Sequence, residues 1–270
     1  MSQIATPHLT PAPADVSPVP RAALLAAFDT LLQPDQFKDY GPNGLQVEGK
    51  PLIQRIVSGV TASRALIEAA IDARADALVV HHGLFWRGQT GCVTGWMKER
   101  LSLLLRHEIN LLAYHLPLDA HPKLGNNAGL AQQLGFNMPE GGQWGRFGDQ
   151  SLGFWGHCAF DDADALAAHI QQVLRRSVVC VSPQRRPIRR VAWCTGGAQS
   201  YFEAAIALGV DAFITGEISE PQTHYARETG VAFLACGHHA TERYGAPGVT
   251  EHVARQLGLH HQFIDVDNPA

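Results

Sequence analysis

The sequence contains few charged residues and no long apolar run. Asp, Glu, Lys and Arg make up only 17% of the 270 residues, and the formal net charge is −4. This balance argues against a generally basic nucleic-acid-binding protein, although it allows a local basic patch. No apolar run approaches the roughly 18–20 residues of a membrane-spanning helix, so we expect no membrane partner. A globular protein remains, long enough to bury a full core as one large or two small domains.

Cysteine is also scarce. The five cysteines are an odd number and show no C-x-x-C spacing. Three of them, Cys180, Cys194 and Cys236, lie in apolar strand-like runs, where free cysteine behaves as a small hydrophobic residue. This usage favours a reducing cytoplasm over a disulfide framework. The first residues are rich in proline and lack a signal-peptide core, so we expect residues 1–20 to form a disordered tail.

Strands and helices alternate along most of the chain. The spacing of apolar residues predicts one helix that opens the fold at residue 21 and four more at about 63–75, 96–107, 127–134 and 162–174. Short apolar runs predict strands at about 55–60, 77–80, 110–114, 152–158 and 178–181. This alternation is typical of an α/β fold with mostly parallel sheets and helices on both faces.

The two halves of the chain match each other. Residues 55–77 align with residues 190–212 at a constant offset of 135. Ordered matches over long blocks indicate an internal duplication, in which two strand–helix units place their ligand loops around a common axis. We therefore predict a metal site between two α/β halves, at 21–140 and 188–270, joined by a connector at 141–187.

Histidines and carboxylates recur where the predicted strands end. A histidine followed four residues later by a carboxylate lies at His115–Asp119 in the first half and at His238–Glu242 in the second. The doublet His81-His82 follows another apolar run. The carboxyl ends of parallel strands are where open α/β sheets bind ligands. Because imidazole nitrogens and carboxylate oxygens bind Zn, Fe, Mn and Ni, we predict two such ions, about 3.5–4 Å apart, sharing a bridging carboxylate.

The individual side chains suggest separate roles. Asp119 is the better candidate for the bridging carboxylate, because a short aspartate near Pro117 makes a defined two-oxygen ligand. Glu242 is a ligand or, alternatively, stabilises a helix N-terminus. His115 binds a metal or, in the interpretation we favour, orients Asp119 and bound water from outside the ligand set. Glu217 aligns with the histidine doublet in the duplication, which makes it a candidate acid of the site.

Three other features have simpler interpretations. Residues 195–197 (Thr-Gly-Gly) follow a predicted strand and could receive an anion, but they lack a nucleotide-binding spacing and we expect a packing turn. Six arginines between residues 175 and 190 form a cluster that is either a solvated surface or a phosphate or nucleic-acid contact. His239 has no counterpart in the first half, so we expect it to support the ligands from outside the ligand set or to have a structural role.

Several of these motifs together resemble the GTP cyclohydrolase 1 type 2 homologue family, the dinuclear-metal-centre hexameric proteins, and within it the short YbgI-like bacterial branch. The resemblance covers residues 37–258. The segments that carry it are residues 40–49 (YGPNGLQVEG), 81–83 (HHG), 115–119 (HLPLD), 124–127 (LGNN), 215–217 (TGE) and 237–243 (GHHATER).

The resemblance implies a toroidal homohexamer, a trimer of dimers, with two divalent metal ions in each subunit facing the interior. Carried over position by position, the implied metal ligands are His81, His82, Asp119, His238 and Glu242. Longer members of the family carry a domain inserted between the halves, and the connector of this chain is too short for one.

Two functions follow from these predictions. The first is a metal-dependent hydrolase in which metal-activated water attacks the substrate and His115 or Glu217 transfers the proton. The resemblance points to a nucleotide substrate, with opening of the imidazole ring of GTP, although the sequence contains no guanine-specific motif. The second is a non-catalytic, ring-shaped metal-binding scaffold that clamps DNA or a protein partner.

Overall fold

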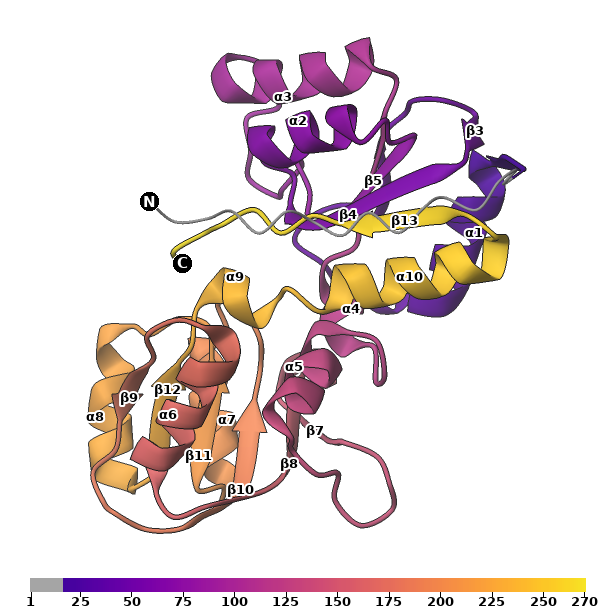
Figure 1. Cartoon of the computed structure of the whole chain (residues 1–270). Coiled ribbons are helices and arrows are strands. Elements are labelled where there is room, and N and C mark those ends of the chain that lie inside the picture. The colour runs from indigo at the N-terminus through magenta and orange to yellow at the C-terminus, as the bar shows by residue number, and fades with distance from the viewer. Residues whose placement is uncertain (1–16) are drawn as a thin grey trace, which may run out of the picture.

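Two β-sheets organise the chain, and each is covered by helices on both faces (Figure 1). The computed structural model describes residues 17–270. The first sheet has the order β13-β4-β5-β6-β2, in which β2 alone runs antiparallel to its neighbour. Its strands are β2 (Gly44–Val47), β4 (Arg55–Thr61), β5 (Ala77–His82), β6 (Asn110–Ala113) and β13 (His260–Phe263).

Side chains on the two faces of the first sheet pack into two separate cores. Leu78 and Val80 of β5 pack with one pair of helices, while Ala77 and Val79 pack with the other pair. This alternation follows from the two-residue period of a strand. The first pair is α2 (Arg64–Asp72) and α3 (Gly95–Arg106), and the second is α1 (Arg21–Leu32) and α10 (Gly245–Leu257).

The second sheet is mixed. Its order is β7-β8-β10-β11-β12-β9, and only β10, β11 and β12 are parallel to one another. Its strands are β7 (Gly145–Phe147), β8 (Gly153–Phe160), β9 (Val179–Val181), β10 (Ile188–Trp193), β11 (Ala212–Thr215) and β12 (Ala232–Ala235). One face carries α5 (Asn126–Leu134) and α6 (Ala163–Leu174), and the other carries α7 (Phe202–Ala207) and α8 (Glu220–Thr229).

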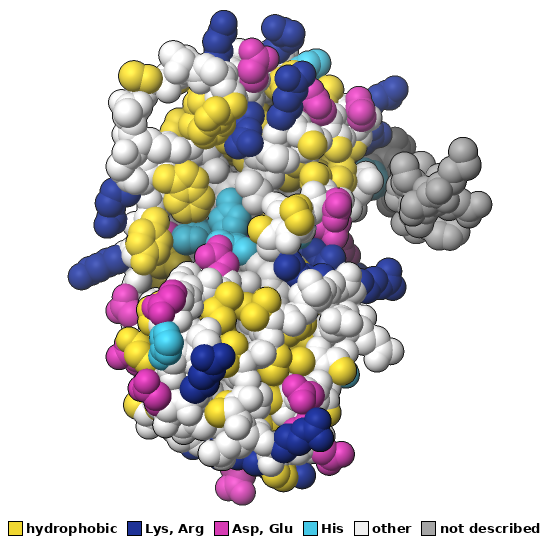
Figure 2. All heavy atoms as spheres, turned by 90° about the vertical axis from the view of Figure 1, so that its left-hand side faces the viewer, with side chains coloured by type: hydrophobic (Ala, Val, Ile, Leu, Met, Phe, Trp, Pro, Cys, Tyr) yellow, Lys and Arg dark blue, Asp and Glu magenta, His cyan; other side chains and the backbone are white. Residues whose placement is uncertain are grey.

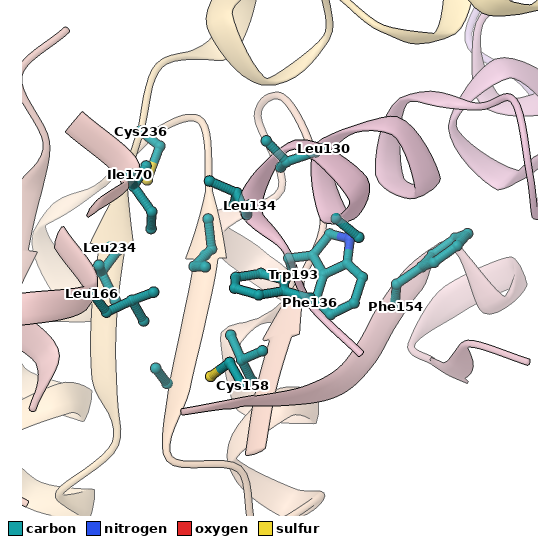
Figure 3. Packing of buried hydrophobic residues seen from close by; sticks show 14 of the residues in the cluster. Leu130, Leu134, Phe136, Phe154, Cys158, Leu166, Ile170, Trp193, Leu234 and Cys236 are labelled. Carbon is teal, nitrogen blue, oxygen red and sulfur yellow. The ribbon is translucent and has the colours of Figure 1, made fainter. Parts of the chain in front are cut away.

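Trp193 lies at the centre of the core beneath α5 (Figure 3). Its ring packs against those of Phe136 and Phe154, and the side chain has no exposed surface. Its indole N–H donates to the backbone carbonyl of Asn127 on α5. The buried ring therefore fixes the N-terminal end of α5, where the metal-centre residues described below are located.

Matched hydrogen bonds confirm the duplication. The side chain of Asp76 accepts from the backbone N–H groups of residues 54 and 55, and that of Asp211 accepts from residues 189 and 190. The β4–β5 and β10–β11 pairs also share one register: Ile56 faces Ala77, and Val191 faces Ala212. Both comparisons keep the offset of 135 residues, so the two units fold alike.

The two units exchange their last helices, which the sequence did not indicate. Helix α5 belongs to the first half of the sequence but packs on the second sheet, whereas α10 and β13 of the second half cover and extend the first sheet (Figure 1). The predicted connector at 141–187 is itself structured, since β7, β8, α6 and β9 complete the second sheet and its helical layer. The lobes therefore differ from the predicted halves, and the chain crosses between them twice.

The structure changes part of the prediction that residues 1–20 form a disordered tail. Residues 1–16 of the expected tail lie outside the described residues, but β1 (Val19–Pro20) pairs with β3 (Leu52–Ile53). The other predicted helices and strands are confirmed with small shifts of their ends. In the described part of the chain, no helix has the length and apolar character required to cross a membrane.

Candidate metal centre

The ligand-bearing segments leave the carboxyl ends of parallel strands in both sheets and meet between the lobes. His81 and His82 end β5, α4 (Leu116–Ala120) follows β6, and α9 (His238–Thr241) follows β12. Histidine side chains gather at the bottom of a hollow between the lobes (Figure 2). This cleft has a volume of about 580 Å³.

Four imidazoles, three that line the cleft and His81 buried beneath it, are each held through Nδ1. The Nδ1 atom of His81 lies 3.2 Å from the carbonyl of Tyr114, and that of His82 lies 3.0 Å from Thr61 Oγ1. The other two histidines donate to carboxylates: His115 to Asp39 and His238 to Glu217, both at 2.6 Å. Because Nδ1 is occupied in all four rings, Nε2 is the nitrogen each ring presents to a ligand.

Glu242 connects the imidazoles. Its Oε1 lies 3.3 Å from His81 Nε2, while its Oε2 lies 3.3 Å from His82 Nε2 and 3.2 Å from His238 Nε2. Glu242 therefore belongs to two groups of three ligands, one with His82 and His238 and one with His81 and Asp119. Since Asp119 belongs to only one group, the geometry favours Glu242 over Asp119 as the shared carboxylate. The longer glutamate, placed at the end of α9, reaches both groups.

The donor set fits divalent cations. Among the described residues, His81 Nε2 and Glu242 Oε2 are buried without a hydrogen-bond partner. Buried polar atoms are normally satisfied, so unpartnered nitrogen and oxygen atoms facing one another indicate a ligand. Two N/O groups that share one carboxylate suit Zn, Fe, Mn or Ni.

The pKa values of the histidines show that the buried carboxylates favour positive charge at this site. Burial disfavours the protonated form of His81, but Asp119 and Glu242 outweigh burial and raise its pKa to about 9. Burial likewise opposes protonation of His238, yet Glu242 and Glu217 raise its pKa to about 9. Burial and the charge on His81 lower the pKa of His82 to about 3. Without metal, protons on His81 and His238 therefore balance the negative charge of the buried acids. Divalent cations bound at the same place can supply this positive charge instead.

Asp119 is held by residues that sequence reasoning did not single out. It lies on the short helix α4 rather than on the expected loop. Its Oδ1 accepts hydrogen bonds from Asn126 Nδ2 and Thr195 Oγ1, and its backbone carbonyl accepts from Asn127 Nδ2. Asn126 and Asn127 belong to the LGNN segment of the family resemblance, which was the available signal. The Asn126 amide and the Thr195 hydroxyl fix the carboxylate through contacts across seven and 76 residues of sequence.

The glycine turn at 195–197 packs against the end of α9, as expected for a packing turn. Gly196 adopts φ +70°, and a side chain there would collide with Glu242 Oε1. Its backbone N–H donates to Thr241 Oγ1, so this N–H is not free for an anion. The turn lets the backbone of the second sheet approach the glutamate closely.

The remaining predicted residues occupy distinct positions. His115 lines the cleft and forms a third ligand group with His81 and His82. Glu217 contacts His238 and does not line the cleft. His239 is bonded to Asp265 and joins no ligand group within residues 17–270, as expected for a residue outside the ligand set. Asp39, which bonds His115, is a site residue that the sequence reasoning missed.

The chain matches known proteins along nearly its whole length. A family model for Duf34/NIF3 (NGG1p interacting factor 3) matches residues 20–269. A Neisseria meningitidis protein named "GTP cyclohydrolase 1 type 2 homolog" is 53% identical over 251 residues, 93% of this chain and 99% of the relative. A Pseudomonas aeruginosa protein of the same name is 49% identical over 251 residues, 92% of this chain and 98% of the relative.

Solved structures agree with these matches. A protein named ybgI, of unknown function, has a TM-score of 0.88 and 44% identity, covering 93% of this chain and all of that one. TTHA1606 from Thermus thermophilus has a TM-score of 0.79 and 30% identity, again over 93% of this chain and all of that one. The resemblance seen in the motifs is confirmed, and the chain belongs to the Duf34/NIF3 family.

Proposed function

We propose that this protein is a metal-dependent hydrolase that holds two divalent ions per chain. The observation that carries the proposal is the position of Glu242, whose two oxygens belong to two ligand groups at the bottom of an open cleft. The ligands of the proposed pair are His81, His82, Asp119, His238 and Glu242. A structural metal site would be closed on all sides, whereas a catalytic site keeps access for substrate and water.

The chain's own residues support hydrolysis. Two divalent ions would supply Lewis acidity and lower the pKa of water. His115 lines the cleft with its Nδ1 held by Asp39, so its Nε2 is directed at the ligand group that it forms with His81 and His82. Glu217 lies behind His238 and holds that ring in place. Of the two residues predicted to transfer the proton, His115 lines the cleft and Glu217 does not.

The cleft suits a planar, anionic substrate. Tyr40, Trp86 and Trp96 line it from the first lobe, and Tyr201 lines it from the second. The guanidinium of Arg100 also lines the cleft and lies 4.8 Å from the centre of the Trp96 ring. Aromatic rings stack on nucleobases, and arginine pairs with phosphate. This lining, with the name of the curated relatives, supports a nucleotide substrate and ring opening of GTP as the first reaction to test.

The test is a hydrolysis assay on the metal-loaded protein with GTP and a panel of other nucleotides. We expect metal-dependent loss of the purine absorbance with GTP and no turnover with Glu242→Gln. Asp35→Asn, which removes an exposed carboxylate outside the cleft, serves as the matched control and should keep full activity. If no nucleotide is hydrolysed with Zn, Mn, Fe or Ni, the hydrolase proposal on nucleotides is wrong.

The scaffold alternative depends on the arginine cluster. Several of its members are engaged within the chain: Arg186 lies 3.5 Å from Asp211, Arg189 donates to the Phe160 carbonyl, and Arg190 stacks on Trp155. A salt-sensitive DNA complex that is lost on replacing Arg185 and Arg186, together with no hydrolysis, would favour the scaffold.

A further inference from the structure

The carboxylate of Asp39 is built into the metal centre from a segment outside the duplication. Its side chain is only 4% exposed. Four donors surround it: Oδ1 accepts from the N–H of Tyr40 and from His115 Nδ1, while Oδ2 accepts from the N–H of Leu116 and from Asn43 Nδ2. A buried carboxylate with four donors is rigid and stays ionised. Burial opposes ionisation, but the hydrogen bond and charge of His115, together with the bonds from Asn43 and Leu116, outweigh burial and lower the pKa of Asp39 to about 2.

The same segment also holds His115 through its backbone. Asn43 Oδ1 accepts from the N–H of His115 at 2.8 Å. The segment that contains Asp39 and Asn43 is therefore hydrogen-bonded to both the ring and the main chain of His115. The ring is flanked by aromatic groups, with the centre of Trp86 at 5.0 Å and that of Tyr40 at 6.0 Å. The orientation of the imidazole is therefore determined on every side except the one facing His81 and His82.

The duplication gives this arrangement a counterpart. His115 aligns with His238, and each donates Nδ1 to a carboxylate at 2.6 Å. The carboxylates come from unrelated positions, because Glu217 follows β11 whereas Asp39 precedes the first duplicated unit. Two independent segments thus supply the same contact to equivalent rings. His238 uses its Nε2 toward Glu242, and the Nε2 of His115 is directed at the group that it forms with His81 and His82.

We propose that Asp39 is the positioning residue of the metal centre and that it makes His115 a sixth metal ligand through Nε2. This inference rests on the proposed metal pair and goes beyond the five ligands assigned above. Carboxylates that orient a ligating histidine typically contribute 10- to 100-fold to metal affinity. Asn at position 39 would keep the shape of the side chain but would turn an amide donor toward existing donors, so Asp39→Asn should release the ring.

The experiment measures the affinity for Co(II) alone and the visible spectrum of the Co(II) protein. We expect Asp39→Asn to weaken Co(II) binding about 10- to 100-fold and to change the absorption bands of the bound ion. Asp35→Asn, which removes a nearby exposed carboxylate, should leave both unchanged. In the His115→Asn background, Asp39→Asn should have no further effect, because the carboxylate acts through the ring. Thermal unfolding of each variant identifies any general loss of structure.

Distinct outcomes overturn distinct claims. If the wild-type chain does not bind Co(II) and Glu242→Gln behaves like wild type, the metal pair itself is wrong. If wild type binds two ions but Asp39→Asn keeps its affinity and spectrum, only the role of Asp39 is wrong. Equal losses of affinity with and without His115 would show that Asp39 supports the fold rather than the ring.

Discussion

Glu242 is shared by two of the three ligand groups, and it is the only carboxylate among the described residues that is shared in this way. Replacing Glu242 with Ala removes a side chain from both of these groups, so we expect metal content to fall from two ions per chain to none. Replacing Asp119 with Ala affects one group, and we expect one ion to remain. Elemental analysis after dialysis measures both values. Equal losses in the two variants would contradict the bridging role of Glu242.

Metal binding should release protons and strengthen as the pH rises. Without metal, the pKa values of His81 and His238 are about 9, so both rings are protonated at pH 7. Each ring must lose a proton to ligate, and the apparent affinity therefore increases from pH 6 until the pH passes about 9. Calorimetry at pH 7 in buffers of different ionisation enthalpy should show about two protons released per chain. Binding without proton release would show that neither ring ligates.

The principal site residues could be predicted from the sequence because their spacing is local. His238 and Glu242 are four residues apart, and a histidine doublet at a strand end is visible in one segment. The contacts that support these residues could not be predicted, because they join distant parts of the chain. Thr195 is 76 residues from Asp119, and His115 is 76 residues from Asp39. The choice between Asp119 and Glu242 as the shared carboxylate depends on where α9 lies relative to β5, which spacing does not encode.

The exchanged helices make each lobe depend on both halves of the chain. Leu130 on α5 is fully buried against the second sheet, and Leu130→Ala should lower the free energy of unfolding by about 2–5 kcal/mol. Because the cavity lies in the second lobe, we expect amide hydrogen exchange to accelerate in β10–β12 more than in β4–β6. Hydrogen-exchange mass spectrometry measures the difference.

The matched control for that experiment is Leu66→Ala. Leu66 lies on α2, is equally well buried, and packs in the core of the first sheet. It should reverse the pattern, with faster exchange in β4–β6. If Leu130→Ala instead affects the first sheet, α5 packs with its own half and the exchange of helices is wrong.

The order of strands and helices was predictable, but their partners were not. Apolar periodicity predicted α5 because it reports which face of a helix is buried. It does not report which sheet buries that face. The connector shows the same limit: β8 and β9 were expected as strands, but their pairing with β10 and β12 arises only from tertiary packing.

At the scale of the whole molecule, we propose the homohexamer that the family resemblance implies. Light scattering coupled to size-exclusion chromatography should give six times the 29.3 kDa mass of one chain. Because the proposed ligands all come from one chain, Glu242→Ala should leave this mass unchanged while removing the metal. A monomeric or dimeric mass for the wild-type protein would contradict the ring.

The central claim is that two cations lie between the lobes and share Glu242. A crystal of the metal-loaded protein, with anomalous data collected at the absorption edge of the bound element, tests it most directly. We predict two peaks per chain, about 3.5–4 Å apart, one beside His81 and Asp119 and the other beside His82 and His238. A single peak, or peaks remote from Glu242, would contradict the account.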